Sequence, residues 1–191
     1  MLTTYAKGLK RHVLHNQDIS MEDVVEITGR DSSLVCLCLL SVLNITLSAL
    51  PINSLLLGVP LVLFSVLYLF KMSIKSLDFK LIRKKISCES WDQYIGKLIP
   101  FIYKFESFSC KRLEGLFLFE NRILSGLSLF IMSFIVLLPI PFANVPGSVG
   151  VILISLAILR RDGLFLAIGY TISFAHVLGA IFGSIYLAQA L

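Results

Sequence analysis

Charged residues are absent from three long stretches of this chain, and this absence limits the folds that it can adopt. No Asp, Glu, Lys or Arg occurs in residues 32–70, 123–159 or 163–191, which contain 39, 37 and 29 residues. Each stretch is longer than the ~18 apolar residues that indicate a membrane-spanning helix. The mean hydropathy of +0.87 agrees with this interpretation. The sequence therefore predicts an all-α integral membrane protein, with one domain over residues 1–191.

Prolines interrupt the first two stretches near their middles, with Pro51 in the first and Pro139, Pro141 and Pro146 in the second. Because proline removes a backbone donor and stops a helix, each stretch is expected to form a helical hairpin with a proline turn. The predicted helices cover about 33–49, 55–70, 123–138 and 148–159. The last would extend only ~18 Å, against a hydrocarbon core of ~30 Å. The sequence leaves open whether hairpin 1 (32–70) and hairpin 2 (123–159) cross the bilayer or enter it and return.

Two polar segments flank the first hairpin. Residues 1–31 are predicted to form a cytoplasmic amphipathic N-terminus. Residues 71–122 carry 11 of the 17 basic residues and are predicted to be cytoplasmic, with an interfacial amphipathic helix. Their basic side chains suit anionic lipid headgroups. A nucleic-acid partner is not expected, because the chain has no soluble basic domain.

Small residues recur every fourth position in the last apolar stretch, which the sequence leaves open as one helix or two. They are Gly163, Ala167, Thr171, Ala175, Gly179 and Gly183. Such stripes allow close approach of membrane helices. We expect the stripe to pack against another hairpin or a second copy of the chain, and the protein to form a homo-oligomer, with a dimer favoured.

The two hairpins resemble copies of one unit. A displacement of 90 residues aligns Pro51 with Pro141, Ser65 with Ser155 and Lys71 with Arg161, and a displacement of 92 aligns Arg30 with Arg122 and Ser41 with Ser133. The sequence therefore predicts an internal repeat of residues 30–73 and 122–163. Repeats with broken helices build the binding sites of many transporters.

Asparagines follow prolines in both predicted turns, as Asn53 and Asn144. One interpretation is a polar pocket for a phosphate or sugar headgroup, formed by amide groups and helix N-termini near Ser54 and Ser148. The other is that Asn and Pro close tight turns. The candidate ligand-binding residues are Asn53, Ser54, Pro139, Pro141, Asn144, Arg161, Asp162 and His176.

Three of these candidates lie beyond the turns, and each has two interpretations. Arg161 and Asp162 could anchor a lipid phosphate or simply end a helix at the interface. His176, in an otherwise uncharged stretch, is a functional candidate or a hydrogen-bonded structural histidine. No catalytic constellation, C-x-x-C pair or glycine-rich phosphate loop is present. The sequence therefore predicts no enzyme activity, metal or cofactor.

Two segments, 138–144 (LPIPFAN) and 159–164 (LRRDGL), resemble the C-terminal signature of the ExoD-like exopolysaccharide synthesis family. Residues 54–60 are similar to the family's first turn, and the central region fits at Pro100, Glu106, Arg112 and 120–122. The resemblance implies a multi-pass protein of the bacterial inner membrane.

Two functional hypotheses follow from this resemblance together with the turns. The first is a non-enzymatic protein that supports exopolysaccharide or envelope glycan synthesis, binds an anionic lipid or lipid-linked glycan between its proline turns, and has the polysaccharide synthesis machinery as a partner. The alternative is a small transporter or flippase-like protein for a lipid-linked or small solute.

Overall fold

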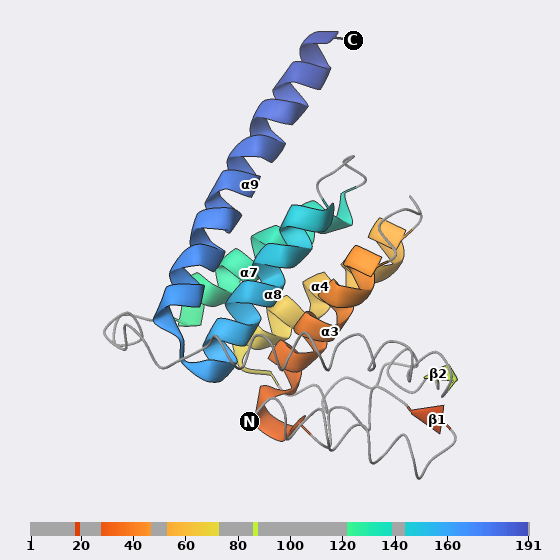
Figure 1. Cartoon of the computed structure of the whole chain (residues 1–191). Helices are drawn as coiled ribbons and strands as arrows, with labels where there is room; N and C mark the ends of the chain where they lie inside the picture. Colours follow the sequence, from red (N-terminus) through yellow and green to blue (C-terminus); the bar gives the residue numbers. More distant parts are fainter. Residues whose placement is uncertain are drawn as a thin grey trace.

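Five apolar α-helices form most of the part of the chain that the computed structural model describes, namely residues 18–19, 28–46, 53–72, 86–87, 122–138 and 144–190 (Figure 1). They are α3 (Ser32–Thr46), α4 (Asn53–Phe70), α7 (Arg122–Leu137), α8 (Asn144–Arg160) and α9 (Gly163–Ala190). A 3₁₀ helix, η1 (Gly29–Asp31), leads into α3. The two-residue strands β1 (Asp18–Ile19) and β2 (Ile86–Ser87) pair antiparallel. Apart from this short pair, the described residues confirm the all-α prediction.

Several predicted features lie outside the described residues. They are most of the amphipathic N-terminus (1–31), the interfacial helix within 71–122, and the turn prolines Pro51, Pro139 and Pro141. These features stay predictions.

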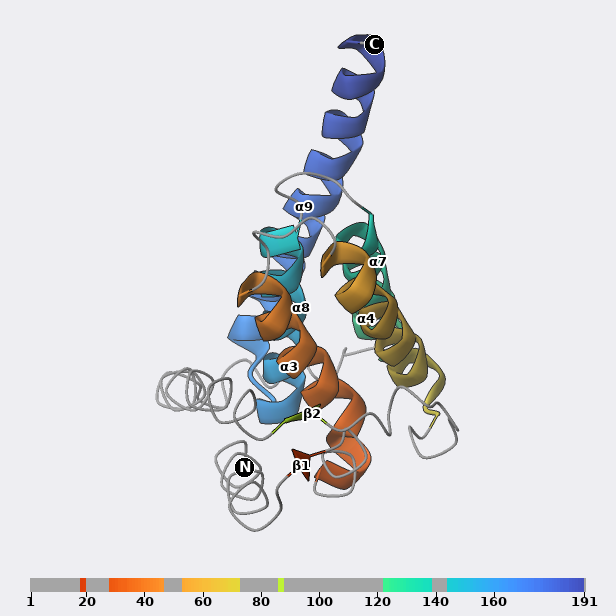
Figure 2. The same ribbon diagram turned by 90° about the vertical axis from the view of Figure 1, so that its right-hand side faces the viewer.

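The four arms of the two predicted hairpins are present and run alongside one another. The helices α3 and α7 begin, and α4 and α8 end, at the same end of the molecule (Figures 1 and 2). We call this end the base. At the opposite end, the turn end, α3 and α7 finish and α4 and α8 begin. Both hairpins thus enter the bundle in the same direction.

The second arm of hairpin 2 is longer than predicted, because α8 begins at Asn144 and not at Ser148. Pro146 lies in its first turn, where backbone N–H groups have no intrahelical acceptor, so proline does not interrupt the helix there. The 17 residues of α8 extend about 25 Å rather than ~18 Å. Pro60 likewise lies inside α4 without ending it. The predicted start of this arm was wrong.

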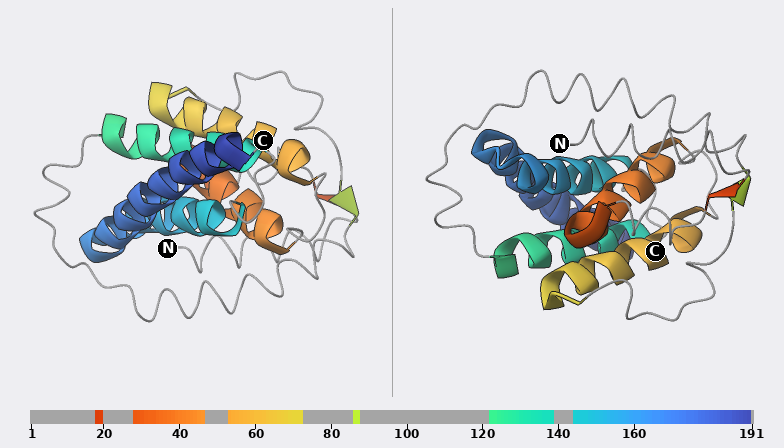
Figure 3. Two further views of the ribbon diagram at one scale, coloured as in Figure 1. Left: turned by 90° about the horizontal axis from the view of Figure 1, so that it is seen from above. Right: turned by 90° about the horizontal axis from the view of Figure 1, so that it is seen from below.

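The hairpins pack crosswise, which means that the first arm of each packs against the second arm of the other. Helix α3 contacts α8, and α7 contacts α4, as the views along the bundle show (Figure 3). Glycines allow α4 and α7 to approach closely. A Cβ atom at Gly58 would lie 2.6 Å from the Leu137 Cα, and one at Gly126 would lie 2.6 Å from a Leu69 methyl carbon. The side chains buried between the hairpins include Leu37, Leu61, Leu129, Met132 and Ile154. In a membrane, the close packing of these side chains would stabilise the bundle, because lipid provides no hydrophobic driving force between helices.

The last apolar stretch forms one helix and not two, because α9 is continuous over residues 163–190. Its N-terminal half packs mainly on α8, where a Cβ at Gly169 would lie 2.7 Å from an Ile154 side-chain carbon. Its C-terminal part projects beyond the turn end (Figures 1 and 2). Among the described residues, α9 is the one helix whose length and composition would let it cross a membrane.

The small-residue stripe lies away from the face by which α9 contacts α8. Ala167, Thr171, Ala175, Gly179 and Gly183 are exposed, and a Cβ at either of these glycines would meet nothing within 4 Å. The contact with α8 uses Leu166, Gly169 and Ser173 instead, which are buried. Gly163 is buried at the start of the helix. Packing of the stripe against a second copy stays a prediction.

Candidate functional site

The C-terminal end of α4 adopts a left-handed turn at Lys71, whose φ is +57°. The backbone N–H of Met72 donates to the Leu67 carbonyl oxygen at 3.0 Å, and that of Lys71 donates to the Tyr68 carbonyl oxygen at 3.3 Å. These two bonds form a Schellman motif, which satisfies carbonyl groups that the helix leaves without partners. The turn carries Lys71 to the base of the bundle.

The end of α8 repeats this motif at positions 90 residues later. Arg161 has a φ of +55°, the N–H of Asp162 donates to the Ala157 carbonyl oxygen at 3.0 Å, and that of Arg161 donates to the Ile158 carbonyl oxygen at 3.3 Å. Glycine is the usual residue at this position, because a side chain in the left-handed conformation costs roughly 1–2 kcal/mol. Both helices therefore carry a basic residue where glycine would be more stable.

Arg122, the first residue of α7, contacts the end of α4 through its guanidinium. Its Nε and Nη2 donate to the Tyr68 carbonyl oxygen at 2.9 and 2.7 Å, and its Cζ lies 4.6 Å from the centre of the Tyr68 ring. A cation at a helix C-terminus is favourable, and so is a cation over an aromatic ring. These contacts fix the guanidinium in one orientation at the base.

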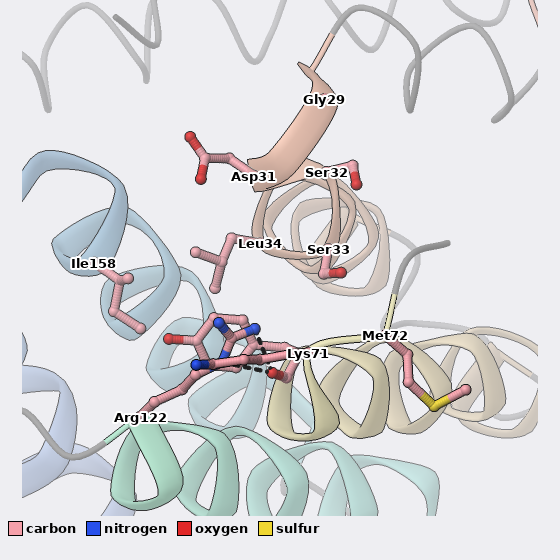
Figure 4. A pocket seen from close by; sticks show the side chains of 10 residues that line it. Gly29, Asp31, Ser32, Ser33, Leu34, Lys71, Met72, Arg122 and Ile158 are labelled. Carbon is pink, nitrogen blue, oxygen red and sulfur yellow. Dashed lines mark hydrogen bonds between the residues drawn. The ribbon is translucent and has the colours of Figure 1, made fainter. Parts of the chain in front are cut away.

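Two adjoining cavities open around Arg122. The larger, of about 620 Å³, is also lined by Lys71, and we call it the Lys71 lobe (Figure 4). The smaller, of about 390 Å³, is also lined by Arg161, and we call it the Arg161 lobe. Both lobes share Asp31, Leu34, Tyr68, Arg122 and Ile158. Every helical arm of the two hairpins thus contributes to this site.

The lining of the two lobes suits an anion with hydroxyl groups. Lys71, Arg122 and Arg161 supply three positive charges against one carboxylate, Asp31. Ser32 and Ser33 place hydroxyl groups on the Lys71 lobe only. Among the described residues, no group of three or more His, Cys, Asp or Glu could hold a metal ion.

Of the two predicted candidates at the end of α8, Arg161 lines the site and Asp162 does not. Asp162 is fully buried, and its Oδ1 accepts the backbone N–H groups of Leu164 at 3.1 Å and Phe165 at 3.4 Å. A side-chain oxygen in this position caps the N-terminus of a helix, here α9. The contacts of Asp162 therefore favour the structural interpretation.

Two of the remaining predicted residues are described, and both lie towards the turn end. Asn144 is half-buried at the start of α8, about 25 Å along that helix from Arg161. His176 of α9 is half-buried, and its Nε2 would lie 3.1 Å from a Cβ at Gly147. Pro139 and Pro141, and the side chains of Asn53 and Ser54, lie outside what the structure describes. Among the described candidates, Asn144 and His176 therefore do not share a site with Arg161.

A buried polar contact at the turn end also escaped the sequence analysis. The Asn44 Nδ2 donates to the Ser148 Oγ at 2.8 Å, and both residues are fully buried. This bond joins α3 to α8 and so connects the two hairpins. Among the site residues, the predicted ligand-binding set missed Asp31, Ser32, Ser33, Tyr68 and Arg122. The sequence alignment of Lys71 with Arg161 at a displacement of 90 residues was the signal that could have indicated a site at the base.

Comparison with known families supports the resemblance noted in the sequence. Residues 6–182, nearly the whole chain, match the family described as "Exopolysaccharide synthesis, ExoD". No curated protein and no solved structure matches the chain. The predicted resemblance is confirmed.

Proposed function

The chain belongs to the ExoD family of exopolysaccharide synthesis proteins, and from this premise we propose that it supports that synthesis by binding the anionic headgroup of a lipid or lipid-linked glycan at the base of its hairpins. Membership of this family implies involvement in exopolysaccharide synthesis and a membrane-associated protein. In this proposal the protein is not an enzyme, and it acts on glycan synthesis by holding a ligand.

The observation that carries the proposal is the left-handed conformation of Lys71 and Arg161. Each residue occupies a position where glycine would remove a backbone cost, and each lines one of the two lobes. Unfavourable backbone conformations that persist in a structure cluster at functional sites. The basic side chains are thus retained at an energetic cost, which a role in anion binding explains.

The proposed site lies at the base and not between the proline turns. The basic lining of the two lobes supports this change, because lipid phosphates lie at the membrane interface, where each nearby Lys or Arg contributes about 1 kcal/mol. In the proposed orientation the base faces the cytoplasm at the bacterial inner membrane, since residues 71–122 follow α4 there and carry most of the basic residues. The hairpins and α9 would then make the protein multi-pass.

An internal repeat is part of the proposal, and the paired helix ends support it. Ser41 and Ser133, aligned at a displacement of 92, are both fully buried, as are Ser65 and Ser155, aligned at 90. The contact of α3 with α8 and that of α4 with α7 are equivalent if α3 corresponds to α7 and α4 to α8. The base site then lies between the two copies.

Assembly with other chains is the last part of the proposal. The exposed stripe on α9 supports pairing with a second copy, because small residues let membrane helices approach closely. The polysaccharide synthesis machinery would receive or present the bound ligand.

A binding experiment in lipid nanodiscs tests the proposed function. The full chain would be placed in nanodiscs of zwitterionic lipid with increasing fractions of phosphatidylglycerol, and bound anionic lipid would be counted by native mass spectrometry. Lys71→Asn and Arg161→Asn remove the charge while keeping a residue that tolerates the left-handed conformation. We expect both variants to retain less anionic lipid than the wild type. Arg160→Gln, which changes the net charge equally at a residue that lines neither lobe, is the matched control.

Equal lipid retention by the wild type and both asparagine variants would disprove the proposed site. Reconstitution of the same proteins in sealed liposomes tests the transporter alternative, because headgroup scrambling by the wild type that Arg161→Asn abolishes would favour transport over static binding.

A further inference from the structure

The two lobes share one cation and each has a second cation of its own. Arg122 lines both, Lys71 lines only the larger and Arg161 only the smaller. We infer that the site takes a diphosphate diester, with one phosphate in each lobe and Arg122 between them, as in a sugar joined to a lipid through a diphosphate. This inference rests on the proposed function and specifies the class of its ligand.

Arg122 is arranged to contact two phosphates at once. Its two hydrogen bonds to the Tyr68 carbonyl oxygen use two of the five N–H groups of a guanidinium. Those bonds and the Tyr68 ring fix the guanidinium plane, and the described residues leave three N–H groups for a ligand. Arginine binds phosphate oxygens through such paired N–H groups. A fixed guanidinium on the shared wall can therefore donate into either lobe.

The charges of the lining favour two phosphates over one. Among the described lining residues, three basic side chains and the Asp31 carboxylate give a net charge of +2. A diphosphate diester carries one negative charge on each phosphate and balances this lining. A phospholipid with a single phosphate diester would fill one lobe and leave the basic residue of the other lobe without a counter-charge from the ligand.

The lobes also differ in a way that orients the ligand. Ser32 and Ser33 line the larger Lys71 lobe but not the Arg161 lobe. Leu159 lines the Arg161 lobe but not the Lys71 lobe. Hydroxyl groups suit the sugar, and an apolar side chain suits the lipid chain. The sugar-bearing phosphate is therefore assigned to the Lys71 lobe and the lipid-bearing phosphate to the Arg161 lobe.

A pair of matched ligands tests the inference. The probes are a synthetic prenyl-diphospho-sugar and a prenyl-phospho-sugar with the same prenyl chain and sugar, titrated onto the full chain in zwitterionic nanodiscs and measured by native mass spectrometry. The wild type should bind the diphosphate about 10- to 100-fold more tightly, as one additional charge-assisted contact predicts. Lys71→Asn and Arg161→Asn should each lose this preference, because diphosphate binding should weaken more than monophosphate binding. Arg160→Gln should keep both.

Cardiolipin, whose two phosphates are separated by glycerol, is the control for total charge. If the wild type binds both probes equally, or binds cardiolipin as tightly as the diphosphate, the diphosphate inference is overturned while the proposed anionic-lipid site stands. If neither the probes nor anionic phospholipids bind, the proposed function itself fails. A preference that survives both asparagine variants would overturn the assignment of one phosphate to each lobe.

Discussion

Arg122 and Tyr68 join the two hairpins at the base, through two hydrogen bonds from the guanidinium to the Tyr68 carbonyl oxygen at 2.9 and 2.7 Å. The same guanidinium lies over the Tyr68 ring, with 4.6 Å between Cζ and the ring centre. Arg122 begins α7, and Tyr68 lies in the last turn of α4. One side chain therefore stabilises the contact between hairpins and forms the wall that both lobes share.

Arg122→Ala should lower the free energy of unfolding by about 2–3 kcal/mol, because it removes charge-assisted hydrogen bonds and a cation–π contact. Arg122→Lys keeps the charge but cannot donate two N–H groups in the same plane, so its loss should be smaller. Equilibrium unfolding in detergent micelles measures both. Arg160→Ala is the control, and equal stability of Arg122→Ala and the wild type would show that the contact contributes nothing to the fold.

Glycine at the two left-handed positions should stabilise the protein and weaken ligand binding. Lys71→Gly and Arg161→Gly should each raise the free energy of unfolding by about 1 kcal/mol, because the backbone cost of the side chain disappears. Arg160→Gly, at the last residue of α8, should instead lower it by up to about 1 kcal/mol. Thermal unfolding of the three variants gives these signs. A loss of stability at both left-handed positions would contradict the explanation for the basic residues there.

The bond between Asn44 and Ser148 should show a measurable coupling. A double-mutant cycle with Asn44→Ala and Ser148→Ala should give an interaction energy of about 0.5–1.5 kcal/mol, in the range found for single hydrogen bonds in proteins and membranes. Unfolding free energies of the wild type, the two single variants and the double variant supply the four values. Purely additive effects would mean that the 2.8 Å contact does not stabilise the hairpin pair.

Gly58 should be intolerant of a methyl group. In Gly58→Ala the new Cβ would lie 2.6 Å from the Leu137 Cα, so α4 and α7 must separate. We expect a loss of about 1–3 kcal/mol, as for other overpacked sites. Gly179→Ala adds the same methyl group where nothing lies within 4 Å, and this variant should unfold no more easily than the wild type. Comparison of the two thermal midpoints checks the crosswise packing of the hairpins.

Leucine substitutions in the exposed stripe of α9 test oligomer formation separately from the folding of the single chain. Gly179→Leu combined with Gly183→Leu should leave the stability of the single chain unchanged, since a Cβ at either glycine meets no described residue within 4 Å. If the stripe forms the contact between copies, the double variant should shift the mass on native gels towards the monomer. An unchanged mass would refute the predicted role of the stripe in oligomer formation.

Charge distribution in the sequence predicted the helices well, because a charged residue marks nearly every boundary at the base. The second arms of the hairpins end at Phe70 and Arg160, within one residue of the prediction. The start of α8 was missed, since a proline in the first turn of a helix and a proline in a turn give the same sequence signal.

The location of the site could not be read from the sequence for a different reason. Helices α8 and α9 are almost uniformly apolar around their circumference, so no periodicity indicates which face is buried. The site also needs Asp31, Tyr68 and Arg122 together, which depends on α4 pairing with α7 rather than on either hairpin alone. The alignment of Lys71 with Arg161 identified two of the site residues as equivalent but not as neighbours of one cavity.

The difference in length between α9 and the hairpin arms has a consequence for the surrounding membrane. At 28 residues α9 is about 42 Å long, while the arms, at 15 to 18 residues, extend only about 22–27 Å from the same base. If all five helices share one bilayer, the turn ends stop several Å short of the far edge of a ~30 Å hydrocarbon core. This difference is a hydrophobic mismatch, which thinning of the distal leaflet around the hairpins would relieve. Such a protein should collect in the thinner regions of a membrane.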